Sequence, residues 1–461
     1  MIDTFAASID AIASALFMPW VVVALMGTAI FLTVRLGFVQ FRRIGEAFRS
    51  TVAGQSAGAG GALSPVQAFM LAVAASVGTG NIAGVATAII SGGPGALFWI
   101  WVFGFFAASL KFAEATLGLT FREMIDGHVR SGPMYYLRDG LRKPWIAWTY
   151  ALVAGIAALT TTPFTQPNSI AVVWESQFAI PTWVTGVIVA VLTWLVIIGG
   201  VKSIGPAMEK LAPLKVGLYL IGGVIVLVSF ASELPGVFAL VFREAFALDS
   251  GLGFGMFIAI RYGIARGVYA TEAGYGTAAV AYGTAKSDRP SQQGLQAVME
   301  VFIVCFITAT ISALTILVTG VAMRSIEAGP DGAGYLTSTA AVAAAFDAAM
   351  PVVGGWMVAF CAFLFGYGTL IGWAYYGEQF LEYIFGPRVT IPYRWIYCLL
   401  IPFGAMARVD VVWAWGDFMN ALQVFPNVVG LIGLSGLVAK FAWDAKTGSR
   451  LQTPDSRPGA R

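Results

Sequence analysis

The sequence predicts an all-α integral membrane protein with about eleven transmembrane helices. Of its 461 residues, 58% are apolar and 11% are charged, whereas about 25% of the residues in soluble domains are charged. Mean hydropathy is +0.79, and apolar runs of roughly 20 residues, the length that crosses a bilayer as a helix, recur along the chain. The runs are continuous and do not alternate with polar residues, which predicts helices rather than barrel strands.

Composition excludes several classes of function. An ordinary cytosolic enzyme needs a charged surface that this chain lacks. The net charge of +3 is spread along the chain, so no basic patch for nucleic acid is expected. The cysteines Cys305, Cys361 and Cys398 lie in apolar segments without metal-site spacing, and the one histidine is His128. A disulfide framework, a zinc site and histidine chemistry are therefore not expected.

Eleven predicted spans set the topology. They cover residues 15–36, 65–91, 94–121, 146–174, 182–200, 211–231, 253–282, 296–323, 351–384, 391–406 and 411–439. Twenty-one Lys and Arg residues, Lys215 among them, are assigned to one set of alternate loops and three to the other. Because positive loops stay in the cytoplasm, we expect a multi-pass protein of the plasma membrane (a bacterial inner membrane). Its N-terminus would lie outside and its C-terminus in the cytoplasm.

Glycine clusters interrupt the second and seventh spans. Residues 76–81 read SVGTGN, and residues 266–276 read RGVYATEAGYG. The two clusters lie five spans apart, and broken helices at matching places in two halves are typical of transporters built from inverted repeats. We therefore expect a five-plus-five inverted repeat. Its parts would be an N-terminal helix and cytoplasmic loop (1–64), a first repeat (65–231), a second repeat (232–440) and a cytoplasmic polar tail (441–461).

A broken helix offers two kinds of polar group inside the membrane. Unpaired N–H groups suit a carboxylate, and freed carbonyls suit a small hard cation such as sodium. A zwitterionic amino acid bound together with sodium fits both ends. The competing interpretation is close helix packing, which small residues at a spacing such as Gly80 and Gly84 also permit.

The chain closely resembles the alanine or glycine:cation symporter family, also called sodium:alanine symporters. The stretches that carry the resemblance are Gly78–Val85, Gly92–Ala96, Gly132–Tyr136, Ala265–Gly267 with Glu272–Gly274, and Gly372–Glu378. They follow one another over most of the chain. The resemblance implies a fold of the leucine-transporter type and import of alanine, glycine or a related small amino acid, with sodium as the co-transported ion.

The resemblance also implies a substrate site and a sodium site. Thr79, Gly80 and Asn81 would form the substrate-binding break, where backbone amides hold the carboxylate. The remaining substrate contacts would be Gln166, the aromatic walls Tyr269 and Trp373, and the second break at Ala270 and Thr271, whose carbonyls face the ammonium group. Sodium would be held by carbonyls near Ala74 and Val77 and by Thr369. The chain departs from the family pattern at Pro163–Thr165, Gly368, Thr271 and Val304, and Gly368 lacks a hydroxyl expected to bind sodium.

Several polar residues allow two interpretations. Glu272, a carboxylate inside a span, is predicted to act in gating or coupling; it could instead accept bonds from unwound backbone or pair with Arg266. Thr369 and Gln166 could bond nearby backbone rather than ligands, and Tyr269 and Trp373 could simply pack. Lys111 and Glu114, three residues apart, are expected to pair. Glu378 and Glu382 are expected to be solvated or paired with Arg394.

The favoured function is sodium-coupled import of a small neutral amino acid by alternating access. The alternative on the same fold is proton coupling or exchange, with Glu272 as the main titrating candidate. A third class, a membrane enzyme or a channel, lacks clustered acids, histidines or cysteines in the spans, or repeated pore motifs. The expected partners are the amino-acid substrate and the lipid bilayer, without nucleic acid, and the expected state is a monomer.

Overall fold

The computed structural model describes residues 8, 11–12, 15–16, 20–52, 60–125, 127–248, 255–330 and 332–443. The part of the predicted polar tail that follows residue 443 lies outside the described residues. The first half contains α2 (Val22–Arg35), α3 (Val39–Arg42), α4 (Ile44–Val52), α5 (Pro65–Ser76), η2 (Thr79–Asn81), α6 (Ala83–Gly92), α7 (Ala96–Thr120), β1 (Glu123–Ile125), β2 (His128–Arg130), α8 (Pro133–Tyr135), η3 (Tyr136–Gly140), α9 (Pro144–Thr160), α10 (Thr162–Phe178), α11 (Thr182–Ile197) and α12 (Val201–Ser229). The second half contains η4 (Ala231–Glu233), α13 (Leu234–Phe246), α14 (Met256–Thr271), α15 (Thr277–Gly283), α16 (Pro290–Val301), η5 (Phe302–Thr308), α17 (Ala309–Val318), α18 (Val321–Ala328), α19 (Ser338–Ala349), α20 (Val353–Phe385), η6 (Pro387–Val389), α21 (Thr390–Met406), α22 (Val409–Gly433) and α23 (Ser435–Trp443).

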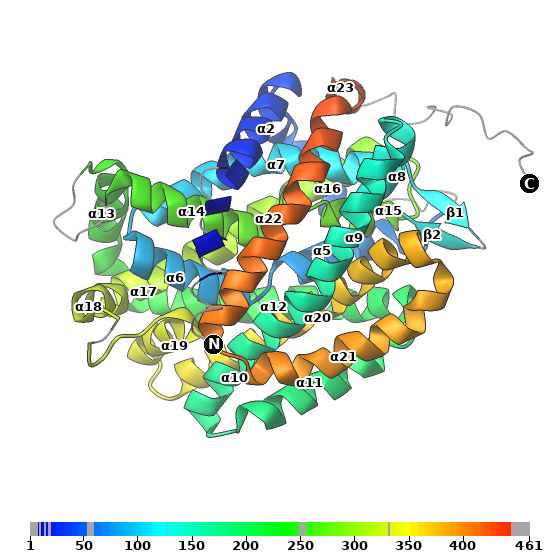
Figure 1. The fold of residues 1–461 in the computed structure, drawn as a ribbon. Helices are drawn as coiled ribbons and strands as arrows, with labels where there is room; N and C mark the ends of the chain where they lie inside the picture. Colours follow the sequence, from blue (N-terminus) through cyan, green and yellow to red (C-terminus); the bar gives the residue numbers. More distant parts are fainter. Residues whose placement is uncertain are drawn as a thin grey trace, which may run out of the picture.

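The all-α membrane fold is confirmed (Figure 1). Within the described residues, 6 helices are long and apolar enough to cross a membrane, and 2 further pairs pass the same test as bent units. These elements correspond to eight of the predicted spans. The other three predicted spans fall on the short helices α2 and α11 and on the interrupted pair α14–α15. The small antiparallel sheet of β1 and β2 lies at one edge of the molecule.

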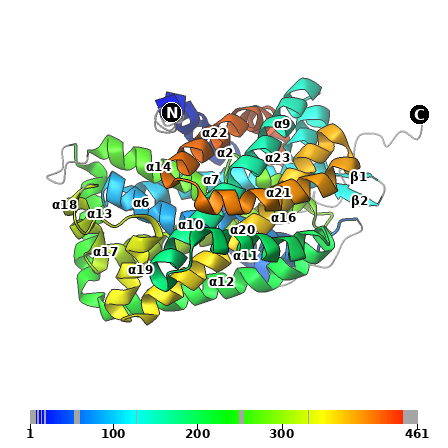
Figure 2. The same cartoon turned by 60° about the horizontal axis from the view of Figure 1, so that its bottom comes forward.

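Helix α12 corrects one of the predicted boundaries. The span predicted at 211–231 begins ten residues earlier, at Val201, and α12 runs along one edge of the molecule in Figure 2. Lys215 was counted with a cytoplasmic loop although the predicted span 211–231 includes it. It lies inside α12, and its side chain is fully buried.

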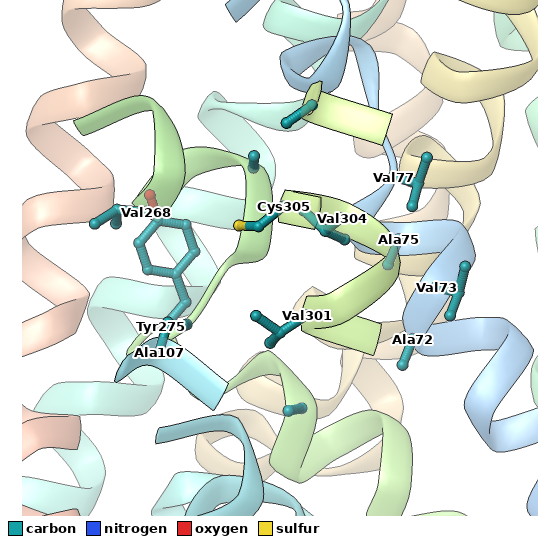
Figure 3. Packing of buried hydrophobic residues seen from close by; sticks show 14 of the residues in the cluster. Ala72, Val73, Ala75, Val77, Ala107, Val268, Tyr275, Val301, Val304 and Cys305 are labelled. Atoms are coloured by element: carbon teal, nitrogen blue, oxygen red, sulfur yellow. The ribbon is translucent and has the colours of Figure 1, made fainter. Parts of the chain in front are cut away.

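Apolar packing forms the interior, and apolar side chains also cover much of the outside. Buried side chains of α5, α14, α16 and η5 belong to one hydrophobic cluster, part of which is drawn in Figure 3. Val304, where the family resemblance implied an aspartate, is fully buried within that cluster. Large apolar side chains such as Leu195, Val228 and Leu399 are exposed, as expected for a surface that faces lipid.

Close approach of α7 and α15 depends on Gly118. A Cβ atom at this position would lie 2.3 Å from the carbonyl oxygen of Ala279, which is backbone and cannot turn aside. Gly118→Ala is therefore expected to lower the free energy of unfolding by about 1–3 kcal/mol. Thermal unfolding of the purified protein in detergent measures this. Gly45→Ala is the control, because nothing lies within 4 Å of its added Cβ atom; equal melting temperatures for the two variants would contradict the prediction.

Candidate functional site

The first predicted break is present between α5 and α6. Helix α5 ends at Ser76, the short helix η2 covers Thr79–Asn81, and the axes of the two halves are bent by 58°. Helical bonds to the last carbonyls of α5 are lost here, because the N–H of Gly78 bonds to the Ser76 carbonyl and the N–H of Asn81 to the Gly78 carbonyl. The freed carbonyls need other partners, since an unpaired buried carbonyl costs free energy.

Side chains from three parts of the chain supply those partners. The Nζ atom of Lys215 donates to the carbonyl oxygens of Ala74 at 2.7 Å and Val77 at 2.6 Å. The hydroxyl of Thr369 donates to the Ala75 carbonyl at 2.6 Å. The side-chain amide of Asn81 donates to the Ser76 carbonyl at 3.0 Å. Four consecutive carbonyls, at residues 74–77, are therefore bonded by side chains.

Gln166 stabilises the N–H side of the same break. Its Oε1 atom accepts from the backbone N–H of Thr79 at 3.0 Å and from the Thr79 hydroxyl at 2.9 Å. Two of the three amides predicted to hold a substrate carboxylate, those of Thr79 and Asn81, are thus engaged in bonds within the protein. Of the three amides, the N–H of Gly80 is the one that takes part in none of the bonds just described.

The second predicted break is also present, between α14 and α15. Helix α14 ends at Thr271, and Glu272 follows with a left-handed φ of 55°. One carboxylate oxygen of Glu114 accepts from the N–H groups of Gly274 at 2.9 Å and Gly276 at 3.2 Å. The same oxygen accepts from Asn427 at 2.9 Å. Glu114 is fully buried on α7. It accepts N–H groups of the second break, as Gln166 accepts the N–H of Thr79 at the first.

The expected charge pairs are partly wrong. Lys111 forms its ion pair with Glu300 at 2.9 Å, not with Glu114. Arg266 pairs with Asp417 at 3.2 Å, not with Glu272. Both expectations took partners that are near in sequence, whereas the partners in the fold come from other helices.

Glu378 and Glu382, two acidic residues near the end of α20, pair with different arginines. Glu378 binds Arg394 through two bonds of 2.7 and 3.0 Å, as expected. Glu382 pairs instead with Arg130 of β2. These pairs connect α20 to α21 and to the small sheet.

Glu272 is held between two side chains. One of its carboxylate oxygens accepts from the indole N–H of Trp373 at 2.5 Å, and the other accepts from the hydroxyl of Thr277 at 2.9 Å. The side chain of Glu272 is 5% exposed. Its carboxylate is therefore fixed at the edge of the second break, where it also forms part of a cavity wall.

Both breaks face the same small cavity. Its lining residues are Ala75, Ser76, Gly78, Gly80, Thr161, Thr162, Gln166, Tyr269, Glu272, Tyr275, Thr369, Trp373 and Asn420. They surround about 340 Å³ of space not filled by atoms, which includes space open to solvent. The cavity lies between the two broken helices and has polar groups from both, which suits a small ligand with opposite charges.

The structure gathers only part of the predicted site at this cavity. The predicted residues that line it are Gly80, Gln166, Tyr269, Trp373, Thr369 and Glu272. Thr79 and Asn81 instead stabilise the first break, and Ala270 and Thr271 are buried in the last turn of α14, where the Thr271 hydroxyl bonds to the Gly267 carbonyl. The sequence reasoning missed Tyr275, although it lies in the glycine cluster 266–276. It also missed Thr161, Thr162 and Asn420, which carry no local signal in the sequence.

The predicted sodium ligands do converge. The carbonyls of Ala74 and Val77 and the hydroxyl of Thr369 lie around one point, because Thr369 is also 3.5 Å from the Ala74 carbonyl. The structure places the amine of Lys215 at that point. The one signal in the sequence was Gly368, which was noted for the hydroxyl it lacks.

Known proteins share this chain's sequence over almost its full length. The sodium:alanine symporter family matches residues 2–453. The sodium/alanine symporter AgcS of Methanococcus maripaludis is 37% identical over 440 residues, covering 94% of this chain and 96% of that protein. The putative sodium/proton-dependent alanine carrier protein YrbD of Bacillus subtilis is 34% identical over 448 residues, covering 94% of this chain and 90% of that protein.

Solved structures share the fold at low sequence identity. MhsT in complex with L-phenylalanine superposes with a TM-score of 0.55 at 13% identity, covering 84% of this chain and 100% of that one. A manganese transporter of Eremococcus coleocola gives a TM-score of 0.55 at 13% identity, covering 83% and 82%. These likenesses show a leucine-transporter-like fold. From the match over residues 2–453 and the relatives above 30% identity, the chain belongs to the sodium:alanine symporter family, whose members are cation-coupled amino-acid transporters and not enzymes.

Proposed function

We propose that the protein imports a small neutral amino acid of the alanine or glycine class by alternating access. The observation that carries this proposal is the shared cavity, which has backbone of the first break on one side and the carboxylate of Glu272 on the other. A zwitterion can satisfy both sides at once. We further propose the orientation expected from the basic loops, with the N-terminus outside the plasma membrane and the C-terminus in the cytoplasm.

The substrate carboxylate would bind at the first break. Gly80 lines the cavity, and its N–H is the donor that the bonds of Thr79 and Asn81 leave available. The substrate ammonium would face Glu272, which replaces the carbonyls of Ala270 and Thr271 in the sequence-based prediction. An ammonium beside a buried carboxylate gains a charge-assisted bond.

Aromatic side chains would limit the size of the substrate. The rings of Tyr269 and Tyr275 and the indole of Trp373 all line the cavity. Trp373 is fixed by its bond to Glu272, and the Tyr269 ring packs against Trp413 with centroids 5.0 Å apart. A wall of fixed rings would resist a large substrate side chain more than a hydrogen or a methyl group.

The coupling cation has two candidates. Sodium is supported by the family resemblance and by the printed names of relatives such as AgcS. Proton coupling or exchange is the second candidate, and one observation favours it: an amine, that of Lys215, bonds to two of the carbonyls predicted to bind sodium.

Ligand-induced thermal stabilisation tests the proposed substrate class. The purified protein is heated with L-alanine, glycine, D-alanine, L-leucine or L-glutamate. A ligand at about 100 times its dissociation constant stabilises the folded state by about 2.7 kcal/mol. We expect stabilisation by alanine or glycine and none by leucine or glutamate; stabilisation by leucine alone would contradict the proposed size limit.

A further inference from the structure

We infer that the amine of Lys215 takes the place of the sodium ion at the first break, so that transport does not require sodium. This inference rests on the proposed transport function and concerns the ion that drives it. It follows from three features of the described residues: the ligands of the amine, the space made for it, and the charge near it.

The amine has the ligands that a bound cation would have. Its Nζ atom lies 2.7 Å from the Ala74 oxygen and 2.6 Å from the Val77 oxygen. Both carbonyls have lost their helical N–H partners because α5 ends at this point. The side chain of Lys215 is 0% exposed, and the Phe365 ring lies 5.5 Å from Nζ. A buried ammonium that donates to two carbonyls and faces an aromatic ring is a satisfied cation.

Gly368 provides the space for this amine. A Cβ atom at residue 368 would lie 2.8 Å from Nζ of Lys215 and 3.0 Å from the Ala74 oxygen. A serine there would place its side chain between the amine and the carbonyl. The glycine at position 368 therefore lacks the hydroxyl of a serine and, for the same reason, leaves space for the amine of Lys215. A metal ion on the same carbonyls would also meet the positive charge of Nζ at contact distance, where like charges repel.

Few charged groups act on the amine. Helices α5 and α17 carry no titratable side chain, and α20 presents Phe365, Gly368 and Thr369 to this region. Burial disfavours the charged form of the amine, and the attraction of the Glu272 carboxylate opposes this effect. No other titratable side chain of these helices bonds to Nζ in the described structure. Those on α12, α19, α20 and η5 are Lys202, Glu209, Lys210, Tyr219, Asp347, Cys361, Tyr367, Tyr375, Tyr376, Glu378, Glu382, Tyr383 and Cys305.

A tethered cation changes what can be transported with the substrate. Sodium can enter from one side of the membrane and leave on the other, but a lysine side chain cannot leave the protein. The two carbonyls of the break are therefore bonded without an ion from solution.

The first experiment compares driving ions in proteoliposomes that contain the full chain. Uptake of radiolabelled L-alanine and glycine is measured with an inward sodium gradient at equal pH, and with an inward proton gradient in choline buffer without sodium. We expect uptake in the sodium-free buffer and no further accumulation from the sodium gradient. Accumulation that requires sodium would overturn the inference and leave the transport function intact.

The second experiment changes the cation itself. Lys215→Ala combined with Gly368→Ser removes the amine and supplies a hydroxyl on a Cβ atom that would lie 3.0 Å from the Ala74 oxygen. We expect the stabilisation of this double variant by L-alanine to become dependent on sodium. Lys210→Ala is the matched control, an exposed lysine on the same helix, and should behave as wild type. A double variant that is stabilised by L-alanine equally with and without sodium would contradict the inference.

The same measurements separate this inference from the proposed function. If no small amino acid stabilises or enters through the wild-type protein under any ion gradient, the transport proposal fails and the inference falls with it. If alanine binds to the wild type only with sodium, the transport proposal stands and the inference is wrong. Folding of each variant is checked by its elution as a single species in detergent.

Discussion

Gly80→Ala is expected to weaken binding of L-alanine by about tenfold to a hundredfold and to abolish measurable uptake. The added Cβ atom would lie 2.8 and 3.0 Å from two carbons of the Tyr269 ring, so either the ring or the break must move. Such overpacking costs about 1–3 kcal/mol, and each 1.4 kcal/mol changes a dissociation constant about tenfold. Because both residues line the cavity, the cost falls on the binding site.

Gly84→Ala provides the matched control for this prediction. It adds the same methyl group four residues later, where the nearest atom is Cδ of Arg266 at an ordinary 3.6 Å. Thermal shift with L-alanine and uptake into proteoliposomes are measured for both variants. Unchanged uptake by Gly80→Ala, or equal losses in the two variants, would show that the substrate does not bind between Gly80 and Tyr269.

Glu114→Ala is expected to lower the free energy of unfolding by about 3–5 kcal/mol. The substitution leaves the N–H groups of Gly274 and Gly276 without their buried acceptor. It also removes the acceptor of the Asn427 side-chain amide. The second break would lose the contact that fixes its path across α7.

Two further variants define what this measurement means. Glu114→Gln keeps one acceptor oxygen, so its melting temperature should fall between those of wild type and Glu114→Ala. Glu327→Ala removes an exposed carboxylate and should change little. If Glu114→Ala and the wild type have the same melting temperature, the carboxylate does not stabilise the break.

The helix breaks were predictable from the sequence for a physical reason. Glycine in a helix interior costs about 1 kcal/mol relative to alanine, so dense glycine clusters at 76–81 and 266–276 indicated interruption. The structure ends α5 at Ser76 and α14 at Thr271, within these clusters. Long apolar runs likewise predicted the spans, because the hydrophobic thickness of the bilayer is a constraint that single segments must meet.

Partners that come from distant parts of the chain were not predictable in this way. Spacing within one helix suggested a pair of Lys111 and Glu114, but Glu300 lies 189 residues further along the chain and bonds Lys111 instead. Lys215 was read as a loop residue because basic residues predict cytoplasmic loops. Its contact with the Ala74 carbonyl joins positions 141 residues apart, and only the fold brings them together.

An experimental structure of the protein with bound L-alanine, determined in the presence of sodium, tests the central claim most directly. We predict alanine in the cavity with its carboxylate at the N–H of Gly80 and its ammonium facing Glu272, while Nζ of Lys215 remains on the carbonyls of Ala74 and Val77. Alanine bound elsewhere, or a metal ion on those two carbonyls with Lys215 turned away, would contradict it.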